Sequence, residues 1–271
     1  MLIQGSGPGR EIFVRELGDA AHPSVVFVHS SGMSGGQWRR HSLLFRDAGY
    51  HVLVPDLIGC GRSEAWGDDS GRFEAEADME VIASLAKEHG PVILIGHSYG
   101  GALALKTARA LRGQITAVAV YDPVLWGPHR EIHGDGFVQK MKERGLLDPA
   151  LRGSEEWMST FVEYWGGEGA WERMAPLARE QMMRSAAQTC DQALALSRDE
   201  EGAETYAAIC APALVLSGSE TPPEMRDSAV RVAEAIPRGE HKVLPGGHMV
   251  PLTHTELFCE AVLSWVRASS S

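Results

Sequence analysis

The sequence predicts an α/β protein with a mostly parallel central β-sheet flanked by helices. Two observations support this fold class. Short apolar runs alternate along the chain with stretches of helical spacing, which is the pattern that crossovers between parallel strands produce. The run 92–95 is also continuously apolar between Gly90-Pro91 and Gly96, as in a strand that is covered on both faces. With 271 residues, 44% of them hydrophobic, the chain can bury the core of one large domain.

Each expected element follows from its own local pattern. The segments with strand composition are 12–17, 24–28, 51–54, 92–95, 115–121, 212–216 and 241–244. The segments with helical spacing of apolar residues are 37–48, 79–86, 102–108, 223–236 and 257–265. The strand at 92–95 falls in the middle of this alternation, so we expect it near the centre of the sheet.

The alternation stops between residues 124 and 206. This third of the chain holds four of the seven tryptophans together with several methionines. Such residues can simply hold a helical insertion together, but an insertion after a parallel strand also covers the crevice where these sheets bind ligands. We therefore predict a core at 1–123 and 207–271 and a helical cap at 124–206 that favours an apolar acyl or aryl group.

Composition disfavours several classes of function. A net charge of −11 offers no basic patch for nucleic acid or for an anionic membrane. The cysteines are scattered without C-x-x-C spacing, which indicates neither a zinc site nor a disulfide framework. Residues 1–10 lack the charged and apolar segments of a signal peptide, and no apolar run is long enough to span a bilayer. We expect a soluble cytoplasmic protein with reduced thiols that could form a homodimer.

The stretch Gly96-His97-Ser98-Tyr99-Gly100 carries the first chemical signal. It stands between the strand at 92–95 and a helical pattern. Glycines two residues before and two after Ser98 permit the close approach of strand and helix that a sharp turn needs. Such a turn exposes the serine hydroxyl and directs the first N–H groups of the helix at the same point, so one turn supplies both a nucleophile and an anion site.

This pentapeptide resembles the nucleophile elbow of the α/β-hydrolase family. Asp56-Leu57-Ile58-Gly59-Cys60-Gly61-Arg62-Ser63 is similar to the D-x-x-G-x-G-x-S loop of that family. The loops that begin at His29 and at Pro245 also match the family in the expected order. The resemblance covers nearly the whole chain outside 124–206 and implies Ser98 as the nucleophile, a helical cap and no cofactor or metal.

In the family, the acid and then the histidine follow the nucleophile along the chain, and the resemblance implies His248 as the base. His248 lies in Pro245-Gly246-Gly247-His248-Met249, directly after the last predicted strand. His97 belongs to the elbow, but its side chain is expected to point away from Ser98. His129 and His133 have metal-ligand spacing without a third ligand nearby.

The acid departs from the commonest family pattern. The family usually carries an aspartate where this chain has Thr221, in Ser217-Gly218-Ser219-Glu220-Thr221-Pro222. Some members, haloalkane dehalogenases among them, place the acid after the strand that follows the elbow helix, and here that position is Asp122. We predict Asp122 as the acid, with Glu220 as the alternative and a water-mediated or absent acid as a third option. Asp122 could instead only cap the turn after its strand.

The resemblance also implies an oxyanion hole made of two backbone N–H groups. One is that of Tyr99, directly after the nucleophile, and the other comes from the loop after 24–28, where we assign Ser31. Family members usually begin this loop with His-Gly, and this chain has His29-Ser30. The Ser30 side chain would narrow the site or add a hydroxyl donor.

A serine nucleophile favours acyl transfer, so we expect a carboxylic ester hydrolase that acts on a small or medium apolar substrate. Thioester or lactone hydrolysis is the alternative, because the same site accepts those bonds. Carbon–carbon bond hydrolysis and cofactor-free peroxidase chemistry also occur on this scaffold. A ligand-binding module without catalysis is the hypothesis of another class. The dehalogenase and epoxide-hydrolase branches use an aspartate in place of Ser98 and are excluded.

Overall fold

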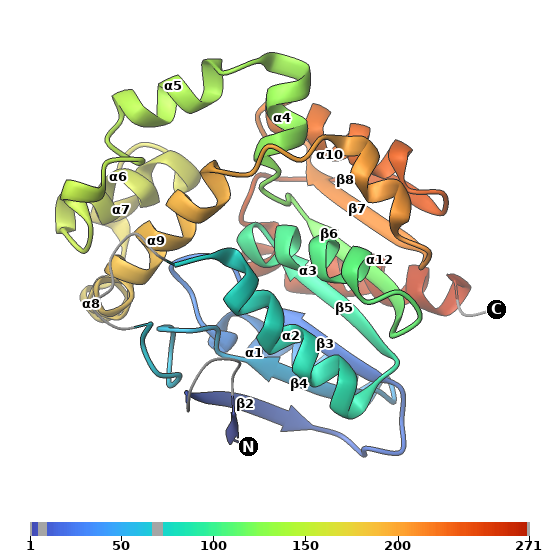
Figure 1. Ribbon diagram of the computed structural model, residues 1–271. Helices are drawn as coiled ribbons and strands as arrows, with labels where there is room; N and C mark the ends of the chain where they lie inside the picture. Colours follow the sequence, from blue (N-terminus) through green and yellow to red (C-terminus); the bar gives the residue numbers. More distant parts are fainter. Residues whose placement is uncertain (1, 5–9, 67–72, 270–271) are drawn as a thin grey trace.

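The computed structural model describes residues 2–4, 10–66 and 73–269, so the glycine-rich stretch 5–9 of the amino terminus lies outside the described residues. The strands are β1 (Leu2–Gln4), β2 (Glu11–Leu17), β3 (Ser24–Val28), β4 (His51–Pro55), β5 (Val92–His97), β6 (Ile115–Tyr121), β7 (Ala213–Gly218) and β8 (Gly239–Leu244). Across the described residues they form one sheet in the order β1-β2-β4-β3-β5-β6-β7-β8 (Figure 1). Strands β3 to β8 pair in parallel, whereas β1 and β2 are antiparallel at one edge. The predicted fold class is confirmed.

Helices cover both faces of the sheet. Helices α1 (Arg39–Asp47) and α12 (Thr255–Ser269) pack on one face, and α2 (Ala75–His89), α3 (Tyr99–Ala110) and α10 (Pro223–Ala235) pack on the other. Strand β3 shows how the sequence builds the two layers. Val25 and Phe27 belong to the first face and Val26 and Val28 to the second, and all four are fully buried. A strand flanked by helices on both sides therefore has a continuous apolar run.

Helices also fill the sequence between β6 and β7. They are α4 (Trp126–His133), α5 (Gly136–Glu143), α6 (Glu155–Gly166), α7 (Ala170–Arg173), α8 (Pro176–Arg184) and α9 (Ala186–Ser197), with the short 3-10 turns η2 (Pro149–Leu151) and η3 (Ala203–Ala208). We call residues 126–197 the helical segment. Its helices α5 to α9 form a separate group to the left of the sheet in Figure 1. Ion pairs join the residues after the helical segment to α3: Lys106 Nζ lies 2.9 Å from Asp199 and 2.8 Å from Glu201.

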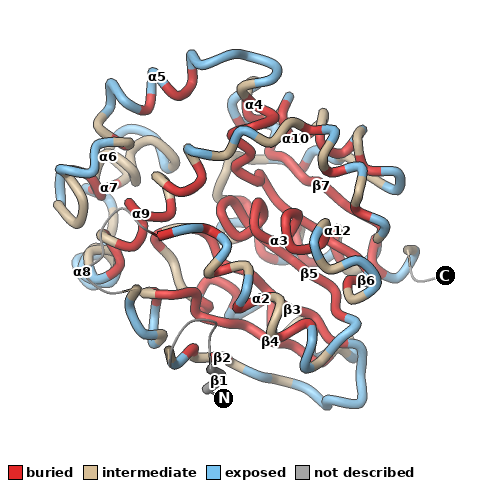
Figure 2. The backbone as a smooth tube through the Cα atoms, viewed as in Figure 1, coloured by how far each residue is buried: buried red, intermediate tan, exposed pale blue. Residues whose placement is uncertain are grey.

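Burial follows this layered arrangement. The central strands and the inner faces of α3 and α9 are buried, while the outer turns of the helices and the connections are exposed (Figure 2). The cysteines of the described residues are free thiols. Among the helices of residues 2–4, 10–66 and 73–269, none has the length and apolar character to cross a membrane.

Candidate active site

Ser98 sits at the turn between β5 and α3 with φ 55° and ψ −117°, a conformation that a residue with a side chain rarely adopts. The neighbouring glycines make the turn fit. A Cβ on Gly96 would lie 2.3 Å from the Gly100 carbonyl oxygen, and one on Gly100 would lie 2.3 Å from the Val28 carbonyl oxygen. Any side chain at either position would therefore force strand and helix apart.

Tyr99 is the first residue of α3, so its backbone N–H has no partner within the helix. Tyr99, Ser98 and Ser31 line the same cavity. The structure thus brings the two predicted oxyanion-hole residues together around the predicted nucleophile. The Tyr99 side chain points elsewhere: its hydroxyl donates to Asp78 Oδ2 at 2.9 Å.

His248 and Asp122 are in contact. His248 Nδ1 lies 3.2 Å from Asp122 Oδ2, and the two side chains are 8% and 3% exposed. Asp122 directly follows β6 and has a φ of 41°. The Thr221 hydroxyl donates to the same carboxylate oxygen at 2.6 Å. Glu220 is exposed, and within the described chain its carboxylate makes no hydrogen bond to His248. The predicted acid, rather than its alternative, lies next to the predicted base.

The imidazole of His248 is held between two rings. Its centroid lies 4.3 Å from that of Trp165 in a stacked arrangement and 4.8 Å from that of His97. In the described part of the molecule, no hydrogen bond joins Ser98 to His248. In hydrolases such contacts often tighten only when substrate binds.

The cavity beside Ser98 is apolar and measures about 40 Å³. Ten of its wall residues are apolar, and nine of them belong to the helical segment. The ten are Val124, Trp126, Phe137, Met141, Leu146, Leu147, Phe161, Trp165, Ala193 and Leu196. No charged side chain is among the described residues that line it. An apolar group of a substrate could therefore pack against apolar side chains directly next to Ser98.

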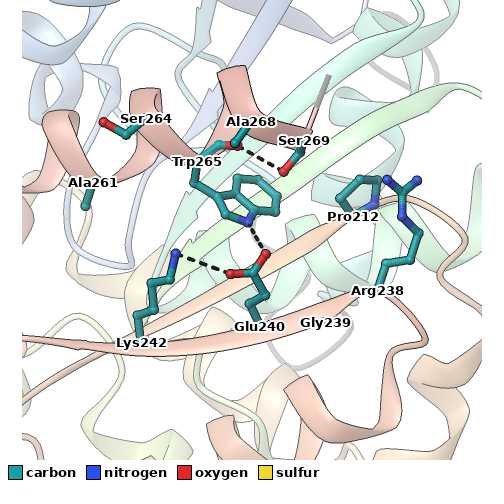
Figure 3. A pocket seen from close by; sticks show the side chains of 10 residues that line it. All are labelled: Pro212, Arg238, Gly239, Glu240, Lys242, Ala261, Ser264, Trp265, Ala268 and Ser269. Atoms are coloured by element: carbon teal, nitrogen blue, oxygen red, sulfur yellow. Dashed lines mark hydrogen bonds and ion pairs between the residues drawn. The ribbon is translucent and has the colours of Figure 1, made fainter. Parts of the chain in front are cut away.

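A larger hollow of about 620 Å³ lies elsewhere (Figure 3). It is lined by Pro212 and Gly239, at the start of β7 and β8. It therefore lies at the amino ends of the parallel strands, whereas Ser98 follows the carboxyl end of β5. Within it Glu240 accepts a hydrogen bond from Trp265 Nε1 at 2.9 Å and pairs with Lys242 at 3.2 Å (Figure 3). These polar groups satisfy one another, and we assign no chemistry to this hollow.

Four of the other histidines have structural partners. His29 Nε2 accepts from the Leu57 N–H at 2.9 Å and so joins two loops. The rings of His129 and His133 pack against each other at a tilt of 41°, and no group of three ligand-type side chains suited to a metal occurs among the described residues. His97 is directed to Gln37 and to the backbone of His248.

Sequence analysis missed Gln37, Trp165 and the contact of Thr221 with Asp122. Gln37 and Trp165 reach the site from 60 and 83 positions away from their partners, His97 and His248. No local pattern marks either residue. For Thr221 a signal existed, because it occupies the position where related hydrolases usually place the acid.

A family model described as "Alpha/beta hydrolase family" matches residues 25–261. The chain belongs to this family. It is a hydrolase, and the match extends from β3 into α12, which includes the turn at Ser98, the helical segment and the loop of His248.

Individual relatives agree with this assignment. The chain is 25% identical over 254 residues, 90% of each chain, to an (E)-2-((N-methylformamido)methylene)succinate hydrolase of Acinetobacter baylyi. It is 30% identical over 117 residues to the lipase LipV of Mycobacterium tuberculosis, and this match spans only 42% of each chain. A thermophilic esterase of Thermogutta terrifontis has a similar fold, with a TM-score of 0.78 at 23% identity over 100% of this chain and 99% of that one.

Proposed function

We propose that this hydrolase cleaves small apolar carboxylic esters through Ser98, His248 and Asp122. The contact of His248 Nδ1 with Asp122 Oδ2 at 3.2 Å is the observation that carries the proposal. A buried carboxylate at this place holds the imidazole so that Nε2 faces the serine and stabilises the imidazolium that forms. An apolar cavity next to Ser98 supports an uncharged acyl group.

In the first half of the reaction Ser98 Oγ attacks the ester carbonyl carbon while His248 Nε2 takes the hydroxyl proton. The N–H groups of Tyr99 and Ser31 stabilise the oxyanion. The tetrahedral intermediate expels the alcohol, which receives the proton from His248, and the acyl group remains on Ser98. Water then attacks the acyl-enzyme with His248 as the base, which releases the carboxylic acid and restores the serine. No step requires a cofactor.

In this proposal residues 124–206, which include the helical segment, act as a cap over the core formed by 1–123 and 207–271. The lining of the cavity beside Ser98 supports this cap assignment, because most of it comes from α4, α5, α6 and α9. A cavity of about 40 Å³ holds roughly three water-sized groups. We therefore propose short acyl chains, from acetyl to butyryl, as the favoured substrates.

Hydrolysis of p-nitrophenyl esters from acetate to dodecanoate tests the proposal. Ser98→Ala is expected to remove nearly all activity, and Asp122→Asn to lower kcat by on the order of 10⁴-fold because an amide favours the wrong imidazole tautomer. Glu220→Gln is the matched control, an exposed carboxylate on a neighbouring loop, and is expected to leave kcat unchanged. If the wild-type protein hydrolyses none of these esters but cleaves a thioester or a lactone, the proposed substrate class changes from ester to that bond.

A further inference from the structure

A chain of buried hydrogen bonds joins the loop after β3 to the loop of His248. The Ser30 N–H and hydroxyl each lie 3.0 Å from Gln37 Oε1. Gln37 Nε2 lies 2.9 Å from His97 Nδ1, and His97 Nε2 lies 2.8 Å from the backbone carbonyl oxygen of His248. Ser30, Gln37 and His97 are at most 9% exposed, so water competes little for these partners.

A neutral His97 fixes the direction of every hydrogen bond in this chain. The His248 carbonyl can only accept, so His97 Nε2 must carry a proton. If Nδ1 is then unprotonated, it accepts from the amide nitrogen of Gln37, and this fixes the orientation of that amide. Gln37 Oε1 therefore faces the two donors of Ser30. Each group finds a complementary partner when His97 is neutral.

The environment of His97 favours this neutral form. Burial lowers the pKa of His97 well below its usual value, and the neighbouring His248 lowers the pKa further. A neutral His97 also avoids placing a second positive charge 4.8 Å from the His248 ring when that ring is protonated.

The chain touches three parts of the proposed catalytic machinery through their immediate neighbours. Ser30 precedes Ser31, and His97 precedes Ser98. The third contact is with the backbone of His248 itself. Gln37 belongs to the 3-10 turn η1 (Gly35–Trp38), which lies outside all three loops. It therefore adds a side-chain bridge between these loops.

We infer that Gln37 and His97 are positioning residues that hold the His248 loop in register with the Ser98 turn and with the loop after β3. Neither residue touches a reacting atom. The inference rests on the proposed serine hydrolase function. A displacement of about 1 Å at a catalytic group can lower the rate by on the order of 10²-fold, so loss of this bridge is expected to act on kcat.

Three variants test the inference. His97→Leu removes both hydrogen bonds of the ring, and Gln37→Met removes the bridge from the other side without changing the elbow. His97→Gln keeps a donor where Nε2 stands. His51→Leu is the matched control, since His51 is also a buried histidine but hydrogen-bonds to Ser24, at the start of β3, and to Glu16 of β2.

With a p-nitrophenyl ester as substrate, His97→Leu and Gln37→Met are expected to lower kcat by on the order of 10²-fold, with KM within about threefold. His97→Gln is expected to recover at least tenfold of the lost kcat, and His51→Leu to keep the wild-type value. A merely structural role would lower the melting temperature without this split between kcat and KM. The inference is overturned if both network variants keep the wild-type kcat, or if His97→Gln is no better than His97→Leu.

A readout without turnover separates this inference from the proposed function. The proton on His248 Nδ1 that faces Asp122 should give a low-field NMR signal that disappears in Asp122→Asn. We expect the signal in the wild type and in His97→Gln, and its loss through exchange with water in His97→Leu and Gln37→Met. If no ester is cleaved but the signal depends on His97 in this way, only the proposed reaction fails. If the signal is unchanged in both network variants, the positioning role fails.

Discussion

The Thr221 hydroxyl donates a hydrogen bond of 2.6 Å to Asp122 Oδ2, the same oxygen that lies 3.2 Å from His248 Nδ1. The Gly218 N–H lies 3.1 Å from Thr221 Oγ1 and so occupies the acceptor side of the hydroxyl. The backbone thereby directs the hydroxyl proton at the carboxylate. Thr221 therefore hydrogen-bonds to a carboxylate that follows a different strand, the proposed acid Asp122.

Replacement of Thr221 by valine is expected to lower kcat by roughly 10- to 100-fold, since a hydrogen bond to a charged group is worth about 1.5–3 kcal/mol. Valine has the shape of threonine, so the effect reports the hydroxyl alone. Thr221→Ser keeps the hydroxyl and is expected to retain most of the activity. Equal kcat values for the valine and serine variants on a p-nitrophenyl ester would show that the hydroxyl does not support Asp122.

The indole of Trp165 covers one face of the His248 imidazole at a centroid distance of 4.3 Å. If His248 becomes an imidazolium during acyl transfer, that charge lies against an aromatic face, which stabilises it by about 0.5–2 kcal/mol. Trp165→Leu is therefore expected to lower kcat between roughly twofold and thirtyfold, and Trp165→Phe to lie between leucine and the wild type.

The control for this prediction is Trp66→Leu, another half-buried tryptophan, which packs on Phe73 away from the cavity. It is expected to leave kcat unchanged. Since Trp165 also lines the cavity, KM is measured for each variant. A change confined to KM would assign Trp165 to substrate binding and not to the imidazolium.

The sheet could be predicted because its strands are apolar on both faces. Strands β3 and β4 show five consecutive buried residues each, which leaves a clear signal in the sequence. Strand β1 has three residues and no comparable pattern, so only its pairing with β2 reveals it. The interruption of the alternation also marked the place of the helical segment, because no strand pattern occurs between β6 and β7.

Only those parts of the candidate site that depend on the order of motifs along the chain, or on glycines in a turn, could be predicted from the sequence. Gly96 and Gly100 indicate the turn at Ser98 in the sequence, because backbone atoms leave no space for a Cβ at either position. Gln37, by contrast, looks like an ordinary polar residue before a helix. Its importance depends on its hydrogen bond to His97, which belongs to β5, four elements further along the chain. Contacts of this kind leave no local signal.

Met141 in α5 is expected to limit the length of the acyl chain, because it is 3% exposed and lines the small cavity beside Ser98. One methylene in an apolar pocket changes kcat/KM by roughly 1–3 kcal/mol. Met141→Ala should therefore move the best p-nitrophenyl ester to a chain about two to three carbon atoms longer. Met79→Ala, on α2 outside the cavity wall, serves as the control. An unchanged chain-length profile in Met141→Ala would place the acyl group elsewhere.

Asp78 of α2 links the core to the helical segment through hydrogen bonds to Tyr99 and Gln192. Its carboxylate is fully buried and accepts hydrogen bonds from the Ile58 N–H and the Tyr99 hydroxyl, both at 2.9 Å, and from Gln192 Nε2 of α9 at 3.3 Å. Burial raises the pKa of Asp78 from 3.8 to about 6 in spite of these donors. The folded state thus binds the proton more tightly than the unfolded chain does.

A raised pKa in the folded state stabilises the protein fully below about pH 3.8, and this contribution is lost as the pH rises through about 6. Asp78→Asn does not titrate. The free energy of unfolding of the wild type minus that of Asp78→Asn should therefore fall by about 2–3 kcal/mol from acidic to neutral pH. Urea unfolding across that range measures the difference, with Glu80→Gln as the control for an exposed carboxyl on the same helix. If this difference changes with pH no more for Asp78→Asn than for Glu80→Gln, folding does not raise the pKa of Asp78.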